Sequence, residues 1–441
     1  MSFWKIAWRN MQQRALASSL TGLSMALGVA LMVLVLVIHQ VVVSQLSNDA
    51  QGYNFIIGPR EASPLEIVLS SVFHIGRAPV PMRYRYYKQF IDGEYAQYAD
   101  VVVPICLGDS FAAPDGQRFR VVGTTPDLFE KLPYGADDEG NDKHYEFREG
   151  RNFKQDNFFE AVLGSVAANR TGLKVGDRFR PSHGLQAGGD EHDEFEVVGV
   201  LAPTGTANDR ALFVNMEGFY LLDGHALSPP PGEGGAGAET ARLAEGTEGQ
   251  PAPLPESQRS VTAFFVRCEP IKASVIEMGL NRGEDRGAKA VAPIYVVNQL
   301  QENFIDPVRV ILLVLTVLIV IVAGISILVS IYNSMSERSH DIAVMRALGA
   351  SRKAVMAIIL VESILLSILG GLAGLVLGHG ILAAAAPVVE YHTGISVPAW
   401  QFTWQETLLV PGLVAFAALV GFLPAVSAYR TDVARTLAGS R

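Results

Sequence analysis

Long apolar runs alternate with polar stretches along this chain and divide it into spanning and water-exposed parts. The runs occupy residues 16–44, 307–332, 354–386 and 407–429. A membrane-spanning helix needs about 20 apolar residues at 1.5 Å each, and every run reaches that length. The first run exceeds the apolar core of a removable signal peptide, and no small-residue cleavage site follows it, so we expect it to be retained. The pattern predicts a membrane protein with four transmembrane α-helices.

Residues 45–306, between the first and second runs, have the pattern of a large folded domain. Short β-branched or aromatic segments bounded by Gly, Pro or Asp alternate with helical segments, which predicts an α/β (α+β) domain. The predicted strands are Tyr53–Ile57, Asp100–Ile105, Phe119–Gly123, Phe195–Leu201, Ala211–Val214, Thr262–Arg267 and Ala290–Val296. The predicted helices are Pro64–Phe73, Arg83–Tyr95, Ala161–Arg170 and Ile271–Leu280.

One stretch inside this domain lacks the residues needed to build a core. Residues 224–257 are rich in Pro, Gly, Ala and Glu and hold few large apolar side chains. Such a segment buries too little apolar surface to offset its ordering entropy, so it is predicted to be a flexible loop. A tether for a partner protein is the alternative.

The distribution of Lys and Arg predicts how the chain is oriented. The short segments 1–15, 333–353 and 430–441 carry Lys and Arg, whereas 387–406 carries neither. Positive loops stay in the cytoplasm, so both termini and 333–353 are expected there, with 45–306 and the short loop 387–406 outside a cytoplasmic (inner) membrane. The segment 1–15, with two tryptophans among its cations, is either an amphipathic helix along the inner leaflet or a plain positive flank.

Charge and motifs exclude several classes of function. The net charge is −9, and the surplus of acids lies in the predicted outer part, which argues against nucleic acid as a partner. The sequence contains no phosphate loop, H-E-x-x-H, C-x-x-C or G-x-S-x-G motif, so we expect no catalytic residues, cofactor or enzymatic activity in this chain. Cys106 and Cys268 both lie in the outer part, where a disulfide is permitted, but their pairing stays open.

Two further features contain ionisable residues but give only weak evidence of a functional site. The run Asp190–Glu194 resembles a metal-binding string, but its spacing forces no ligand geometry, so a solvated acidic loop is favoured and no metal site is expected. His39, inside the first span, shows no partner in the sequence and is interpreted as a packing or interfacial residue.

The segment between the second and third spans has a distinctive local pattern. Ile342 and Met345 belong to an apolar stripe at helical spacing, with charged residues on either side. Gly349 is predicted to end this short helix, and Ser351 to cap the next one. The pattern predicts a short charged helix at the cytoplasmic membrane surface.

The third span carries glycines at four-residue intervals, namely Gly370, Gly374 and Gly378. Small residues at this spacing let another helix approach closely, which predicts a helix-packing face. Its partner is expected to be the second or fourth span of the same chain, or the same helix in a second chain.

The stretch Glu337–Gly371 resembles the MacB/FtsX-type permeases of ABC transporters. These carry a charged motif ending in R-A-L-G-A-[ST]-R, followed by an apolar helix with a Glu and a Gly-Gly pair. The matching residues here are Glu337-Arg338, Asp341-Ile342, Arg346-Ala347-Leu348-Gly349-Ala350-Ser351-Arg352, Glu362 and Gly370-Gly371. The plan of a long outer domain followed by three closely spaced spans is also similar.

The resemblance implies a function and a set of partners. The segment 333–353 would be a coupling helix that docks on a separate ATP-binding subunit, and the permease would form a homodimer or heterodimer in the lipid bilayer. The coupling residues implied are Glu337, Arg338, Asp341, Ile342, Met345, Arg346, Ala347, Leu348, Gly349 and Ala350. The complex would extrude or extract a lipoprotein, peptide or drug-like substrate, with a periplasmic adaptor or lipoprotein as a further partner. The alternative is a non-transporting signalling or scaffold subunit that regulates a periplasmic or cell-wall enzyme.

Overall fold

The chain folds into two compact units, which are described separately. The computed structural model describes residues 3–137, 139–184, 193–227, 252–283, 287–337, 346, 349–393 and 395–430. The membrane unit comprises Met1–Val42, Asn303–Val388 and Val397–Arg441, and the globular unit comprises Val43–Glu302 and Val389–Ser396.

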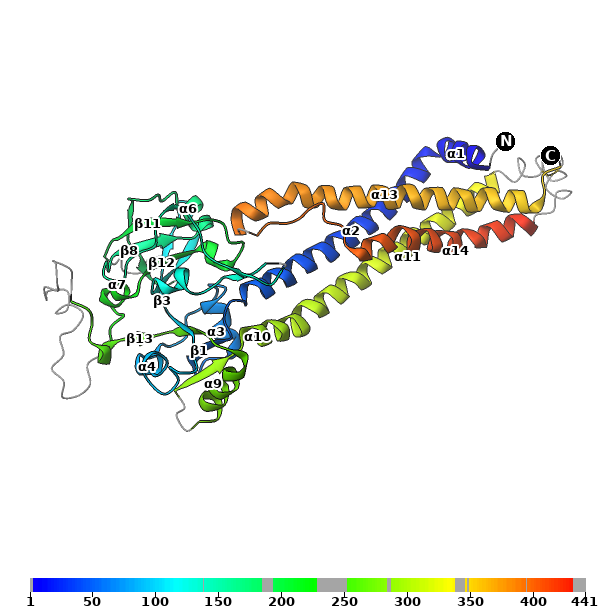
Figure 1. Cartoon of the computed structure of the whole chain (residues 1–441). Helices are drawn as coiled ribbons and strands as arrows, with labels where there is room; N and C mark the ends of the chain where they lie inside the picture. Colours follow the sequence, from blue (N-terminus) through cyan, green and yellow to red (C-terminus); the bar gives the residue numbers. More distant parts are fainter. Residues whose placement is uncertain are drawn as a thin grey trace. The chain divides into compact units, whose positions relative to one another are not determined.

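The membrane unit is built from long apolar helices that run side by side (Figure 1). The helices are α1 (Phe3–Gln13), α2 (Ala15–Asp49), α11 (Asp306–Glu337), α13 (Arg352–Thr393) and α14 (Leu409–Arg430). In the described part of the chain, four helices are long and apolar enough to cross a membrane. The prediction of four transmembrane helices with a mixed α/β domain between the first two is confirmed.

The helix of the third span is longer than the apolar run that predicts it. The apolar run ends at residue 386, before Pro387, which lacks a backbone donor and crowds the preceding turn. In the structure α13 passes through Pro387 and ends at Thr393. Proline in the last turns of a long helix removes a single hydrogen bond, and apolar residues on both sides keep the helix going.

Eleven strands of the described chain form one mixed sheet in the globular unit. Its main path has the order β15-β1-β14-β3-β4-β12-β8-β11-β7, with β10 paired to β3 and β9 to β11. The pairs β4–β12 and β8–β11 are parallel, and the others are antiparallel. The strands are β1 (Phe55–Pro59), β3 (Val101–Ala112), β4 (Arg118–Thr124), β7 (Phe147–Gly150), β8 (Glu160–Leu163), β9 (Arg178–Phe179), β10 (Ser182–His183), β11 (Phe195–Leu201), β12 (Ala211–Asn215), β14 (Ala263–Arg267) and β15 (Ala288–Val291).

Both faces of this sheet are buried. Neighbouring strand residues such as Val121 and Val122 belong to two different core clusters, because successive side chains point to opposite faces. Helices cover the faces and edges, which explains why strands such as Phe195–Leu201 are apolar almost throughout. The helices of this unit are α3 (Pro64–Ser71), α4 (Arg85–Ile91), α5 (Asp127–Glu130), α6 (Ser165–Thr171), α7 (Met216–Leu221), α9 (Pro270–Arg282) and α10 (Pro293–Leu300).

Two of the predicted segments in this unit were assigned wrongly. Residues Glu160–Leu163 form strand β8, between β12 and β11, although we predicted a helix from Ala161 to Arg170. A short apolar run does not show by its periodicity whether it is a buried strand or a helix, and here Gly164 separates the strand from α6. Strand β15 ends at Val291, and the predicted strand residues from Pro293 onward begin α10 instead.

Both cysteines of the chain lie in this unit. Cys106 and Cys268 are buried and form no disulfide with each other. Burial raises the pKa of the Cys106 thiol to about 12.

Two predicted loops lie partly outside the described residues. These are residues 228–251 of the predicted flexible loop and Asp190–His192 of the acidic run. At the loop's base the Leu227 amide donates to the Gln258 carbonyl at 2.8 Å.

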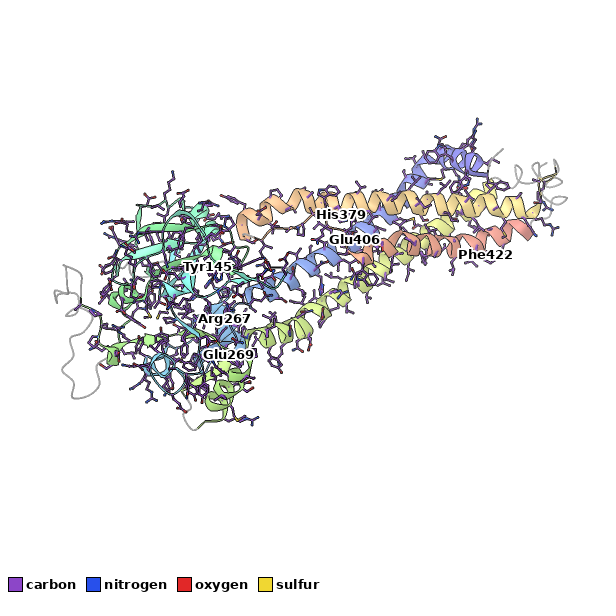
Figure 2. All side chains as sticks on the ribbon, in the orientation of Figure 1. Tyr145, Arg267, Glu269, His379, Glu406 and Phe422 are labelled. Carbon is purple, nitrogen blue, oxygen red and sulfur yellow. The ribbon has the colours of Figure 1, made fainter. Side chains whose placement is uncertain are left out.

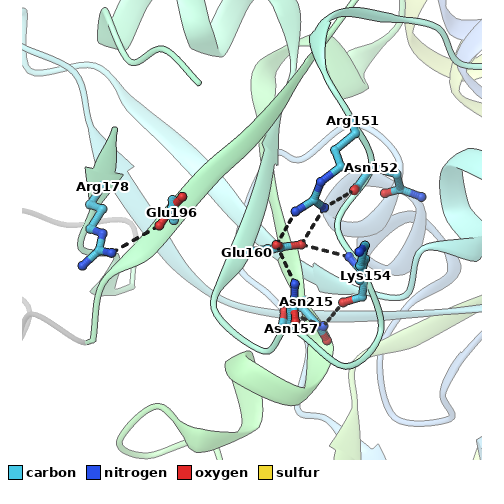
Figure 3. A network of polar contacts seen from close by, with 8 residues as sticks. All are labelled: Arg151, Asn152, Lys154, Asn157, Glu160, Arg178, Glu196 and Asn215. Carbon is cyan, nitrogen blue, oxygen red and sulfur yellow. Dashed lines mark hydrogen bonds and ion pairs between the residues drawn. The ribbon is translucent and has the colours of Figure 1, made fainter. Parts of the chain in front are cut away.

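A polar network ties β8 to the loop before it (Figure 3). The Glu160 carboxylate accepts bonds from the Arg151 guanidinium at 2.6 and 2.9 Å, the Lys154 amide at 3.0 Å and the Asn157 side chain at 2.8 Å. Burial raises the pKa of Glu160, but these bonds together hold it below its ordinary value of 4.5. The ionised carboxylate therefore stabilises this part of the fold.

We expect Glu160→Gln to destabilise the globular unit by about 1–3 kcal/mol, because the amide cannot accept all of these bonds. The folded-state pKa is depressed, so the contribution is present above pH 4.5 and is lost as the pH falls through the folded value. Hydrogen exchange of the β8 amides in the full-length chain measures the change. Glu196→Gln is the matched control. Glu196 forms an exposed ion pair with Arg178, and such a pair contributes at most about 1 kcal/mol to the free energy of unfolding. Equal protection in the two variants would contradict the prediction.

Candidate functional site in the membrane unit

The segment between α11 and α13 contains the predicted coupling residues. Glu337 is the last residue of α11, and Arg346, Gly349 and Ala350 are described beyond it. Arg338, Asp341, Ile342, Met345, Ala347 and Leu348 lie outside the described residues.

The structure confirms the predicted helix stop and cap that close this segment. Gly349 has φ of +101°, a left-handed conformation that favours glycine, and its amide donates to the Arg346 carbonyl at 3.1 Å. The Ser351 hydroxyl then accepts a bond from the Ala354 amide at 3.2 Å, at the start of α13. Gly349 therefore forms a sharp turn where the segment meets the third span, with open space around its Cα.

The glycines of the third span are buried against the first span. A Cβ added to Gly374 would lie 2.6 Å from the Ala26 carbonyl oxygen and from Val29 Cβ. At Gly370 it would lie 3.1 Å from the Gly22 carbonyl oxygen, and at Gly378 it would lie 3.2 Å from that of Ala30. The backbones of α13 and α2 thus approach so closely that only glycine fits on the α13 side.

The first span was not among the expected partners, which were the second or fourth span of the same chain or the same helix in a second chain. The reason lies in α2, where Gly22, Ala26 and Ala30 follow the same four-residue spacing. Two stripes of small residues facing each other maximise van der Waals contact between backbones. The stripe on α2 was a usable sequence signal for this pairing, and it was missed. We call the paired stripes the glycine seam.

A buried pair of ionisable side chains joins α13 to the turn before α14 (Figure 2). His379 of α13 places its Nε2 2.9 Å from Glu406 Oε2, and both side chains are about 1–2 % exposed. The other ring nitrogen, Nδ1, lies 2.7 Å from the Ala399 carbonyl oxygen. Sequence analysis did not predict this pair.

The surroundings of the pair hold both groups in place. Glu406 Oε1 accepts bonds from the Thr403 hydroxyl and amide at 2.9 and 3.2 Å, in a capping box that begins the turn Trp404–Leu408. The rings of Trp400 and Phe402 lie 5.9 and 4.4 Å from the His379 imidazole. The loop before α14 is therefore fastened to α13 through one buried histidine.

His39 of the first span also has a partner that the sequence did not reveal. Its Nε2 lies 2.9 Å from Asp306 Oδ1 at the start of α11, and Arg309 lies 4.0 Å from the same oxygen. The interpretation of His39 as a packing residue is therefore incomplete, because it also joins the first span to the second. Its partner is distant in sequence, so no local pattern could disclose it.

The comparisons with known proteins cover both units. Residues 18–245 match the family model described as a MacB-like periplasmic core domain, and residues 313–433 match the one described as FtsX-like permease C-terminal. The first match alone covers more than half of the 441 residues. The chain belongs to the MacB/FtsX-type family of ABC transporter permeases. It is accordingly a multi-pass membrane protein.

The match covers a different share of the length of each relative. The uncharacterized ABC transporter permease MJ1507 of Methanocaldococcus jannaschii is 26% identical over 314 residues, which cover 68% of this chain and 67% of the relative. The uncharacterized ABC transporter permease YknZ of Bacillus subtilis is 33% identical over 130 residues, 27% of this chain and 30% of YknZ. The macrolide export ATP-binding/permease protein MacB of Photorhabdus laumondii is 32% identical over 130 residues, 29% of this chain and 19% of MacB.

The permease thus matches about two thirds of MJ1507, but less than a third of YknZ and of MacB. Among solved structures, the extracellular domain of the noncanonic ABC-type transporter YknZ from Gram-positive bacteria aligns with 54% of this chain and 99% of that domain. The sequence identity is 10% and the TM-score 0.28, a value too low to establish a shared fold.

Two helix ends of the permease are bonded to loops of the globular unit. In the last turns of α2, Gln45 donates to the Gly205 carbonyl at 2.5 Å, and Asp49 accepts from the Ala207 amide at 3.2 Å. At the end of α13, the Arg170 guanidinium lies 4.9 Å from the Tyr391 ring and bonds to His392. These contacts lie within the globular unit, to which the last turns of α2 and α13 belong.

Proposed function

We propose that this permease is the transmembrane subunit of an ATP-driven complex whose nucleotide chemistry is carried out by a separate ATP-binding subunit. The observation that carries the proposal is the FtsX-like permease match over residues 313–433, which includes the predicted coupling segment and the α13 glycines of the glycine seam. The sequence contains no phosphate loop, and the match to MacB covers only 19% of a relative whose name joins ATP-binding and permease functions. These points support a division of the two functions between chains.

In this proposal the segment 333–353 docks on the ATP-binding subunit at the cytoplasmic surface. Lys and Arg in this segment and at both termini support a cytoplasmic location for all three, with the globular unit outside the inner membrane. The Gly349 turn connects the docking segment to α13 at a fixed point, so a displacement of the segment is passed to the third span. A pair of permease chains, each with its ATP-binding subunit, would act together.

The spans then carry this displacement to the globular unit. The glycine seam couples α13 to α2, and the far ends of both helices are bonded to globular loops through His392, Gln45 and Asp49. The last turns of α2 and α13 belong to the globular unit, so both helices are continuous from the spans into that unit. The work done outside the membrane would be extrusion or extraction of a lipoprotein, peptide or drug-like substrate.

Affinity purification of the full-length chain in mild detergent tests the docking proposal. We expect a stoichiometric ATP-binding subunit with the wild-type chain, and about tenfold less with Arg346→Glu or Gly349→Leu. The first variant reverses a charge on the docking segment, and the second forces a side chain into a left-handed turn. Arg9→Glu is the control, because this charge reversal lies at an exposed position of α1, outside the docking segment.

Normal recovery of the ATP-binding subunit with both Arg346→Glu and Gly349→Leu would contradict the docking proposal. A chain that purifies intact without any ATP-binding subunit would instead favour a signalling or scaffold role. Gel filtration of every variant checks that membrane insertion and oligomer size are unchanged.

A further inference from the structure

Two histidines converge on one buried aspartate in the globular unit, away from the membrane helices. Asp109 lies on β3 and is completely buried, His225 is 8 % exposed, and His183 on β10 is about half exposed. Their ligand-type atoms all lie within 4.8 Å of one another. In the described part of the chain, this is the group of His, Cys, Asp and Glu side chains that could hold a metal ion.

The local fold is shaped to bring these three side chains together. His183 is the cross-strand partner of Asp109 in the antiparallel pair β10–β3, so their side chains lie on the same face. The β3–β4 register shifts between Leu107 and Asp109, and such a bulge re-aims the side chains next to it. Gly108 makes room for the third member, because a Cβ there would lie 2.7 Å from His225 Cε1.

The distances within the group match those between ligands of a tetrahedral metal ion. His183 Nδ1 lies 3.2 Å from Asp109 Oδ1, and His225 Nε2 lies 3.1 Å from each oxygen of that carboxylate. A zinc ion with bonds of about 2.0–2.1 Å spaces its ligand atoms about 3.3–3.4 Å apart. A metal ion can therefore be accommodated with small shifts of the two imidazole rings.

Charge also favours a cation at this position. A carboxylate with no solvent exposure is costly unless it is paired with positive charge. A divalent ion bound by both histidines and by Asp109 would place positive charge directly at this carboxylate. Imidazole nitrogen with carboxylate oxygen is a donor set that suits zinc and neighbouring transition metals.

The site borders a cavity of about 850 Å³. His183 and His225 both line it, together with Gly108 and the side chains of Arg77 and Arg120. Three protein ligands leave a tetrahedral ion one open position, which water or an oxygen or nitrogen donor in the cavity would fill.

We propose that Asp109, His183 and His225 form a binding site for a divalent transition metal of the Zn²⁺ type, with its open position toward this cavity. The sequence offered a different candidate, the run Asp190–Glu194, and there Glu194 forms an exposed ion pair with Arg180 at 3.1 Å. The proposed ligands come from three segments far apart in the chain, so their spacing carried no signal. The site does not depend on the proposed docking of an ATP-binding subunit.

Zinc binding to the purified full-length chain, with any affinity tag removed, tests this site. Competition with a chromophoric chelator is expected to show one Zn²⁺ bound per wild-type chain. Loss of a direct ligand should weaken binding by more than about tenfold in His183→Ala and in His225→Ala. His144→Ala is the matched control, because it removes an exposed imidazole from the same unit. Co²⁺ in place of Zn²⁺ should give visible absorption bands in the wild-type chain that both ligand variants lack.

Equal zinc affinity in the wild-type chain, His183→Ala and His225→Ala would overturn the proposal. It would also be overturned if replacing Asp190, Glu191 and His192 by alanine abolished binding while His225→Ala bound like the wild type. Asp109→Asn tests whether a loss of zinc binding is caused by misfolding. It keeps the size of the side chain but lowers its charge, and it should weaken zinc binding while leaving thermal unfolding in the presence of a chelator unchanged or improved.

Discussion

Gly374→Leu is expected to separate the first and third spans and to lower the stability of the membrane unit. A Cβ at this position would lie 2.6 Å from the Ala26 carbonyl oxygen, which is backbone and cannot rotate away. The helices must move apart, and the close contact along the whole glycine seam weakens. Overpacking of this kind costs about 1–3 kcal/mol, and a lost helix–helix contact adds to it. Thermal unfolding of the full-length chain in detergent measures the effect.

Gly380→Leu is the matched control for this change. Gly380 lies on the same helix, is exposed and has no atom within 4 Å of an added Cβ. It receives the same increase in side-chain volume and the same gain in helix propensity, so the two variants differ in the packed neighbour alone. Equal melting temperatures for the two variants would show that the seam does not hold these spans together.

Removing one member of the pair His379–Glu406 is expected to cost about 3–5 kcal/mol, because the other is left buried without its partner. The loop before α14 should also lose its attachment to α13, since Thr403 is held by the same carboxylate. His379→Leu and Glu406→Leu, measured singly and together, form a double-mutant cycle. We expect the double variant to lose much less than the sum of the single losses, because neither ionisable side chain is left buried without the other.

Strict additivity of the two losses would contradict this coupling. Asp127→Asn serves as a comparison, because Asp127 forms an exposed pair with Lys131 at 2.9 Å. Such a pair contributes at most about 1 kcal/mol, so this variant sets the scale of a surface contact in the same chain.

Features with a local cause could be predicted from the sequence. Span length follows from apolar composition, and the turn at Gly349 and the cap at Ser351 follow from the intrinsic preferences of those residues. The α/β character of the inserted domain was predictable for the same reason, because most of its strands have β-branched or aromatic residues between turn residues. The docking role of the segment 333–353 stays a prediction.

Features that depend on distant partners could not be predicted in this way. Strand β8 is a strand because it lies between β12 and β11, not because of its own four residues. His379 belongs to the third apolar run and Glu406 to the short loop after it, and His39 meets Asp306 only after the helices pack. The pairing of α13 with α2 is the exception, because the small residues Gly22, Ala26 and Ala30 were visible in the sequence.

The helical connection into the second span differs in kind from the bonded ends of α2 and α13. Between α10 and α11 the residues Gln301–Ile305 form a π-helix, whose turn holds one residue more than an α-turn. A π-turn can slide along a helix or revert to α-geometry, which changes the phase of the helix without breaking it. Within the membrane unit, the side chains of α11 would then rotate about the helix axis, whereas the glycine seam holds α13 against α2.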